Sequence, residues 1–247
     1  DSEVRAKHRL IIGPWGHKWK WTNKLGAFSL TSEQKEPPFP ITEQKWLNHH
    51  ARHIANGVEN TPTVQYYVMG PFDKSNIRGN EWKTSDGWPP EGAEYARYYL
   101  GKECILSTSI TTAESKGVLF HAKDPTPTIG GRNLFLPDGP FDVKELTSRD
   151  DVLLYSTPQL DKETEVTGRV VAHLYLSHGT KERDVSLRLV DIYPTGEHYL
   201  IAEGYTHMSP QETFVPDHVI VDLWTTSMVF AKGHKIGLLI SASNFPA

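Results

Sequence analysis

The second half of the chain is a succession of short apolar segments that are separated by proline and glycine, with no helical pattern between them. Within one segment Val185, Leu187 and Leu189 alternate with polar residues, so the three side chains would line one face of a strand. Residues 193–196 have the composition of a turn between two strands. The pattern predicts strands at residues 64–69, 96–100, 152–155, 166–176, 185–193, 199–205, 218–223 and 235–240. A series of this kind is typical of a β-sandwich or jelly roll.

The first sixty residues have a different pattern. An apolar run at residues 10–12 predicts a short strand, and Thr42 is suited to cap a helix that runs from Glu43 to about Asn56. Gly57 would end that helix. A strand, a loop and a helix in this order fit the last elements of an α/β sheet. We therefore expect two domains, a remnant of an α/β domain at residues 1–60 and a β-sandwich at residues 61–247.

A histidine follows the first predicted strand in the sequence Gly13-Pro14-Trp15-Gly16-His17. Loops at strand ends are where rigid scaffolds hold reactive groups, and a histidine there can act as a general base near neutral pH. The chain contains no G-x-S-x-G sequence, which would mark a nucleophilic serine on a strand-to-helix turn. His17 is therefore the catalytic candidate, with its serine expected upstream of Asp1. The alternative is a loop histidine that caps a turn.

Composition excludes several classes of partner. A formal net charge of −4 over 247 residues argues against a nucleic acid or an anionic membrane surface. No apolar stretch is long enough to span a membrane, so we expect a soluble protein. The sequence does not distinguish a cytoplasmic from a secreted location. The single cysteine, Cys104, excludes an internal disulfide and favours a structural thiol over a nucleophile. We expect no cofactor and no metal.

Two pairs of residues could bind a cation, and each has a simpler explanation. His49 and His53 are four apart on the predicted helix, which suits a metal only if further ligands converge. An exposed helix face explains them better. Asp150 and Asp151 fit a turn that leads into a strand better than a cation site.

Aromatic residues raise two further alternatives. Trp15 and Trp19, with Trp21 nearby, could form the wall of a substrate pocket, although packing between the α/β part and the β-domain is the favoured explanation. In the β-region the aromatic side chains could form a sugar-binding platform, with core and interdomain packing as the commoner role; these residues are Tyr66, Tyr67, Tyr98, Tyr99 and Trp224.

The ordered motifs resemble the C-terminal half of the cocaine esterase and X-prolyl dipeptidyl peptidase-like (CocE/NonD) serine hydrolases. The similarity covers essentially the whole chain. The segments that carry it are 13–17, Trp46-Leu47, 67–70, Trp82, Trp88-Pro89, 124–131, 149–153, Gly168, 189–192, Gly196, 230–236 and 243–246.

The resemblance implies a three-part enzyme with an α/β-hydrolase core, a helical cap and a C-terminal jelly roll of the galactose-binding-like kind. It implies that His17 belongs to a Ser-His-Asp triad, whose serine and aspartate precede this chain. The implied partners are the upstream hydrolase and cap domains and a small acyl ester, amide or peptide substrate, with self-association through the β-domain left open. We expect this chain alone to be inactive. The competing hypothesis is a non-catalytic β-sandwich that binds a carbohydrate or another partner.

Overall fold

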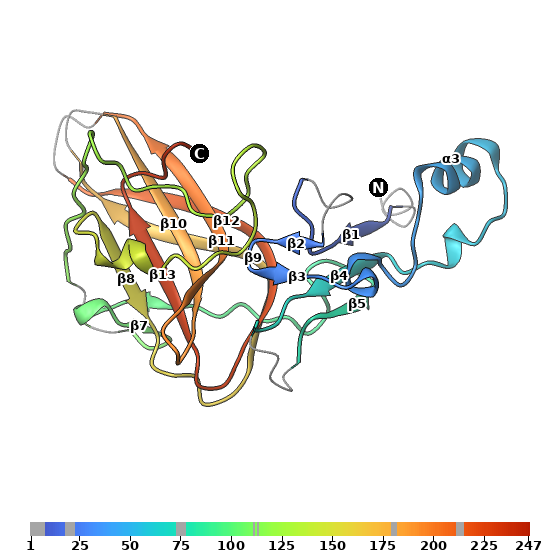
Figure 1. Ribbon diagram of the computed structural model, residues 1–247, viewed down its shortest axis with the longest axis horizontal. Helices are drawn as coiled ribbons and strands as arrows, with labels where there is room; N and C mark the ends of the chain where they lie inside the picture. Colours follow the sequence, from blue (N-terminus) through green and yellow to red (C-terminus); the bar gives the residue numbers. More distant parts are fainter. Residues whose placement is uncertain are drawn as a thin grey trace.

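The computed structural model describes residues 8–17, 23–72, 78–110, 112, 114–178, 182–210 and 215–247 of the chain. A β-sandwich forms the larger part, and a small sheet with short helical segments extends from it toward the N-terminus (Figure 1). The fold is thus mainly β, with a jelly-roll-like sandwich after a short α/β segment, as the sequence predicted.

The sandwich consists of a four-stranded and a two-stranded antiparallel sheet. The first has the strand order β11-β10-β13-β8 and the second pairs β12 with β9. Their bounds are β8 Val152–Ser156, β9 Thr164–Leu176, β10 Arg183–Ile192, β11 His198–Met208, β12 Asp217–Phe230 and β13 Lys235–Ser241. The predicted turn at residues 193–196 joins β10 to β11.

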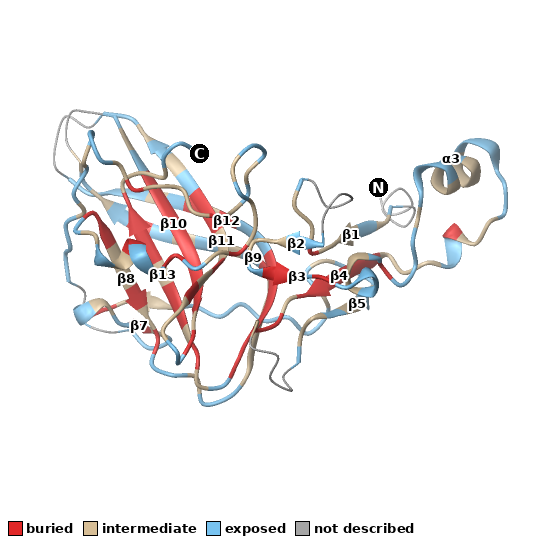
Figure 2. Cartoon of the chain, viewed as in Figure 1, coloured by how far each residue is buried: buried red, intermediate tan, exposed pale blue. Residues whose placement is uncertain are grey.

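The core lies between the two sheets. Leu187 and Leu189 of β10 pack in one cluster with Val221 and Leu223 of β12. Strand β10 is buried along most of its length (Figure 2). Its opposite face is covered by Val143 and neighbouring residues, which form a second apolar cluster. The alternation that predicted the strands is therefore the alternation that builds the core.

Every strand predicted after residue 60 differs in its bounds from the strand in the structure, and two of the differences are informative. The strand expected to end at Leu223 continues to Phe230, because a bulge absorbs the irregularity: Trp224 has a φ of 69° and the register with β9 shifts between Asp222 and Thr225. The strand expected at residues 96–100 shrinks to β6, Tyr99–Leu100, which pairs with β7, Leu106–Ser107. Short 3-10 turns lie at Val58–Asn60 (η1), Lys102–Cys104 (η2) and Lys144–Ser148 (η3).

The N-terminal part contains a parallel pair of strands with a helix in the connection. Strand β1, Leu10–Ile12, runs parallel to β4, Val64–Val68, and β4 pairs on its other side with β5, Glu81–Ser85. Helix α3, Glu43–Arg52, lies between β1 and β4 in the sequence, which makes a β-α-β unit. A hairpin of β2, Lys24–Leu25, and β3, Phe28–Ser29, and the short helix α2, Ser32–Lys35, complete this part.

Helix α3 begins as predicted and ends early. The side chain of Thr42 accepts a hydrogen bond of 3.1 Å from the amide of Lys45, which caps the first turn. The helix stops at Arg52 because His53 adopts a left-handed conformation with a φ of 55°, so the expected end near Asn56 is wrong. The side chain of Asn56 instead reaches back and donates to the carbonyl of Lys45 at 2.7 Å.

The β1–β4 pairing joins residues on both sides of the expected domain boundary. Leu10 is aligned with Val64 and Ile12 with Tyr66, so a division between residues 60 and 61 would pass through this sheet. The division into 1–60 and 61–247 therefore stays a prediction. Within the described residues, no helix has the length and apolarity that crossing a membrane would demand.

Candidate active-site histidine loop

His17 is exposed in the turn that follows the carboxyl end of β1. The preceding residues make this turn tight. A Cβ on Gly13 would overlap the indole ring of Trp15, which folds back over the glycine, and Pro14 is buried. The local sequence thus brings the chain out of the strand and leaves the imidazole accessible.

Of the two tryptophans considered for a substrate pocket, Trp15 is described by the structure and Trp19 is not. The Trp15 indole donates from Nε1 to the carbonyl of Lys35 at 2.9 Å and lies 5.8 Å from the ring of Trp82. Trp82 in turn packs on Tyr67. These contacts favour the packing role for Trp15, whereas its role as a pocket wall stays a prediction. Trp19, like Trp21, lies outside the described residues.

A long loop of the sandwich, residues 130–140, lies against residues 13–17, which we call the histidine loop, and against the β2–β3 hairpin that follows it. The amide of Ala27 donates to the carbonyl of Pro140 at 2.8 Å. A Cβ on Gly16 would overlap the carboxylate of Asp138, and one on Gly139 would lie 2.8 Å from the amide nitrogen of Gly26. Backbone therefore packs on backbone between Gly139 and Gly26, which only glycine allows, whereas Gly16 leaves room for the Asp138 side chain.

The loop has a closed base and an apolar tip. Gly131 and Gly139 exchange two backbone hydrogen bonds of 2.8 and 2.9 Å, which close the base. The amide of Arg132 donates to the Glu203 carboxylate at 2.8 Å. At the tip, the side chain of Phe135 is 95% exposed and that of Leu134 is 56% exposed. Sequence reasoning missed these residues; the signal available was the apolar run Leu134-Phe135-Leu136 between Gly130-Gly131 and Asp138-Gly139-Pro140.

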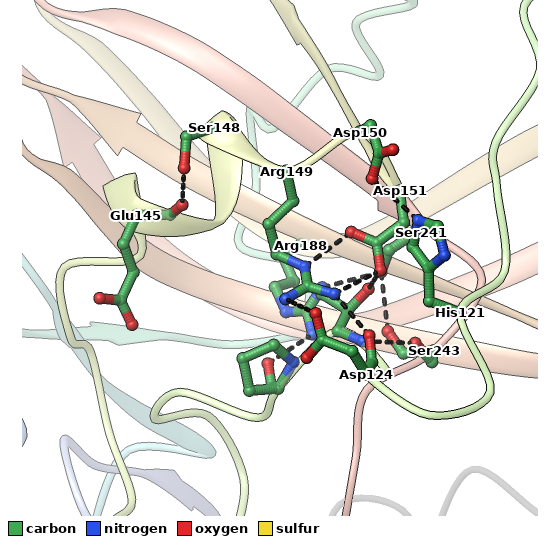
Figure 3. A network of polar contacts seen from close by, with 12 residues as sticks. His121, Asp124, Glu145, Ser148, Arg149, Asp150, Asp151, Arg188, Ser241 and Ser243 are labelled. Atoms are coloured by element: carbon green, nitrogen blue, oxygen red, sulfur yellow. Dashed lines mark hydrogen bonds and ion pairs between the residues drawn. The ribbon is translucent and has the colours of Figure 1, made fainter.

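A polar cluster elsewhere on the sandwich accounts for the Asp150-Asp151 pair (Figure 3). Asp151 is buried and forms an ion pair with Arg149, whose hydrogen bonds hold the pKa of Asp151 below its usual range. Asp150 pairs with Nε2 of His121 at 2.9 Å. An open hollow of about 630 Å³ lies beside this cluster, and its lining includes Phe120, His121, Lys123, Arg149 and Asp150. Since both carboxylates have partners, the turn explains them better than a cation site.

The helix histidines have structural contacts. Nδ1 of His49 lies 3.3 Å from the carboxylate of Glu59, and His53 forms the left-handed end of α3. In the described part of the chain, no three or more His, Cys, Asp and Glu side chains come together as a metal site would require. Cys104 is a free, half-buried thiol in the η2 turn.

The aromatic residues considered for a sugar platform do not share one surface. Tyr66 and Tyr67 are buried, and Tyr98 and Tyr99 are half-buried. Trp224 is exposed, but the Arg132 guanidinium lies 4.5 Å from its ring centroid. The structure therefore favours packing over a sugar platform for this set.

Comparisons with known proteins agree with this architecture. The sequence profile of the X-Pro dipeptidyl-peptidase C-terminal non-catalytic domain matches residues 56–247. Cocaine esterase of Rhodococcus sp. (strain MB1 Bresler) is 33% identical over an alignment that covers 98% of this chain and 44% of the esterase. An α-amino acid ester hydrolase superposes with a TM-score of 0.72 at 20% identity, over 96% of this chain and 43% of that one. A CocE/NonD family hydrolase from Staphylococcus aureus superposes with a TM-score of 0.55 at 17% identity, over 83% of this chain and 38% of that hydrolase.

Residues 56–247, which include the sandwich, are thus the non-catalytic C-terminal domain of a class of esterases and peptidases. The chain belongs to the cocaine esterase and X-Pro dipeptidyl-peptidase (CocE/NonD) family, as the resemblance predicted. It spans less than half the length of the relatives described above. His17 precedes residues 56–247, the segment that matches the non-catalytic domain. The alignment with cocaine esterase, in contrast, covers nearly all of this chain.

Proposed function

We propose that this chain is the C-terminal portion of a serine hydrolase that cleaves ester or amide bonds, of the esterase, acylase or Xaa-Pro dipeptidyl-peptidase kind. The observation that carries the proposal is the position of His17, exposed just beyond the carboxyl end of β1 in a β-α-β unit. In open α/β sheets, ligands bind outside the carboxyl ends of the strands. A histidine in that position can reach a substrate.

In this proposal His17 acts as the general base and then the general acid of acyl transfer. The imidazole takes the proton of a serine hydroxyl as the acyl group is attacked, and returns it to the leaving group. The serine and the aspartate that orients the imidazole come from the upstream hydrolase domain. Among the described residues β1 is the edge strand of its sheet, so upstream strands could continue the sheet beside it.

The sandwich loop at residues 130–140 would supply part of the substrate site. Its apolar tip, Leu134 and Phe135, extends from a base that packs on the histidine loop and hairpin. An apolar acyl or aromatic group is the chemistry that such side chains bind. The upstream cap domain would close the remaining side of the site.

The test compares this chain with the complete protein, which is expressed from the whole reading frame that encodes the chain. We expect the complete protein to hydrolyse p-nitrophenyl butyrate and to be labelled by a fluorophosphonate probe, because both report an activated serine. We expect this chain alone to show neither reaction. Labelling of the chain alone, or no hydrolysis of aryl esters, aryl amides or Xaa-Pro amides by the complete protein, would contradict the proposal.

A further inference from the structure

A charged side chain of the sandwich lies against the histidine loop. Asp138 is half-buried in the loop at residues 130–140, and its Oδ2 occupies the space that a Cβ on Gly16 would need. Gly16 is the residue directly before His17. The carboxylate therefore lies against the backbone that carries the imidazole, although it comes from the other part of the molecule.

Two sets of backbone contacts hold the chain next to Asp138. Gly139, with a φ of 99°, packs on the backbone of Gly26, and the Pro140 carbonyl accepts the hydrogen bond from Ala27. Gly131 closes the loop through its paired backbone hydrogen bonds with Gly139. Because these contacts are between backbones, they hold the backbone that carries Asp138 next to Gly16.

The remaining space around Gly16 is also occupied. A Cβ at that position would lie 2.9 Å from Cδ1 of Leu25, in the hairpin that follows the histidine loop. The turn is therefore enclosed by Asp138 on one side and by Leu25 on another. Removal of the carboxylate would leave the loop with room to shift.

We propose that Asp138 is a positioning residue for His17: its carboxylate fits against Gly16 and fixes the backbone from which the imidazole projects. This inference rests on the proposed function. A displacement of about 1 Å in a catalytic group can lower a rate about 100-fold. The non-catalytic domain would thus set the geometry of a group that it does not contain.

The experiment is a double-mutant cycle in the complete protein, with kcat and KM measured for p-nitrophenyl butyrate. We expect Asp138→Ala to lower kcat about 10- to 100-fold with KM within about threefold. Asp138→Asn, which has nearly the same shape, should keep kcat within about threefold of the parent. The control is Asp86→Ala, an exposed aspartate in a different loop, which should leave kcat unchanged.

The second arm of the cycle uses the steric fit. Gly16→Ala alone should lower kcat, because the new methyl group overlaps the carboxylate. The double variant Gly16→Ala/Asp138→Ala should recover at least about fivefold of that loss, because the space is free again. Thermal unfolding of every variant shows whether it is folded.

The outcomes separate this inference from the proposed function. Unchanged kcat in Asp138→Ala, an Asp138→Asn variant as slow as Asp138→Ala, or additive losses in the double variant would each overturn the positioning role while His17→Ala remains inactive. Full activity in His17→Ala would instead refute the proposed function. If Asp138→Ala fails to fold, the Asp138→Asn and Gly16→Ala variants decide the question.

Discussion

Arg149 holds the carboxylate of Asp151 with two hydrogen bonds, 2.7 Å from Nε to Oδ1 and 2.9 Å from Nη2 to Oδ2. The hydroxyl of Thr126 donates a third bond to Oδ2 at 2.9 Å. Since Asp151 is 1% exposed, its charge has these partners in place of water. The three residues thereby attach the loop at Thr126 to the start of β8.

Breaking this arrangement should destabilise the fold. We expect Arg149→Ala to lower the free energy of unfolding by about 3 kcal/mol, because it leaves a buried carboxylate without its cation. The exposed neighbour offers a matched control: Asp150→Asn should cost less than about 1 kcal/mol. Urea unfolding at pH 7 measures both, and equal effects of the two changes would contradict the account.

The same pair predicts an acid dependence. Arg149 lowers the pKa of Asp151 in the folded state, so the stabilisation is complete above the unfolded-state pKa of about 3.9. It is lost as pH falls through the folded-state pKa. The stability difference between the parent and Asp151→Asn should therefore be constant from pH 7 to 5 and shrink below about pH 4. A difference that shrinks between pH 7 and 6 would be inconsistent with this cause.

His198 predicts a second pH dependence in a different range. Burial lowers the pKa of His198, against a smaller opposing influence of Asp142, so the fold favours the neutral imidazole. The resulting stabilisation is present above the unfolded-state pKa of about 6.5 and is lost as pH falls through the folded-state value. We expect the parent to lose more stability than His198→Gln between pH 7.5 and 5, by urea unfolding. Identical losses would exclude this role.

Gly26 should be intolerant of a side chain for a reason beyond its backbone conformation. Its φ is 60°, and a Cβ would lie 2.8 Å from the carbonyl carbon of Pro140. Gly92 has a φ of 82° and open space around the same position, so Gly92→Ala reports the backbone strain alone, about 1 kcal/mol. Gly26→Ala should cost about 3 kcal/mol, since the hairpin must also separate from the sandwich loop. Thermal unfolding compares them, and equal costs would show that the loop and hairpin are not in contact.

Phe135 should contribute to substrate binding in the complete protein. Phe135 is almost fully exposed at the tip of the loop at residues 130–140, so its truncation should leave the fold intact. We expect Phe135→Ala to lower kcat/KM for p-nitrophenyl butyrate about 5- to 30-fold, with a smaller effect on the acetate ester. Tyr95→Ala, an equally exposed aromatic residue elsewhere, is the control and should have no effect. Equal losses for both esters would argue against an acyl pocket at this loop.

Local sequence patterns predicted the elements whose stability is local. The alternation at Val185, Leu187 and Leu189 marked β10, and Thr42 marked the start of α3. The end of α3 escaped prediction because His53 takes a left-handed conformation that glycine or asparagine usually signals. Strand β5 escaped because its sequence, Glu81–Ser85, is mostly polar and its pairing with β4 defines it.

In the candidate site too, local features could be predicted from the sequence and contacts between distant segments could not. The position of His17 in a turn after β1 was predictable because a strand, a tight turn and a histidine follow one another in the sequence, whereas its catalytic role stays a prediction. The contact of Asp138 with Gly16 was not, because it joins two loops that are far apart in the chain and depends on how the sandwich packs on the β1 sheet. No local periodicity encodes such a contact.

The most direct test of the account is the hydrolysis of p-nitrophenyl butyrate by the complete protein with His17→Ala. Exposed His207, on β11, provides the matched control as His207→Ala. We predict that His17→Ala lowers kcat by about 10⁴-fold or more while the unfolding temperature stays at the parent value, and that His207→Ala leaves kcat unchanged. A folded His17→Ala protein that hydrolyses the ester at the parent rate would contradict the central claim.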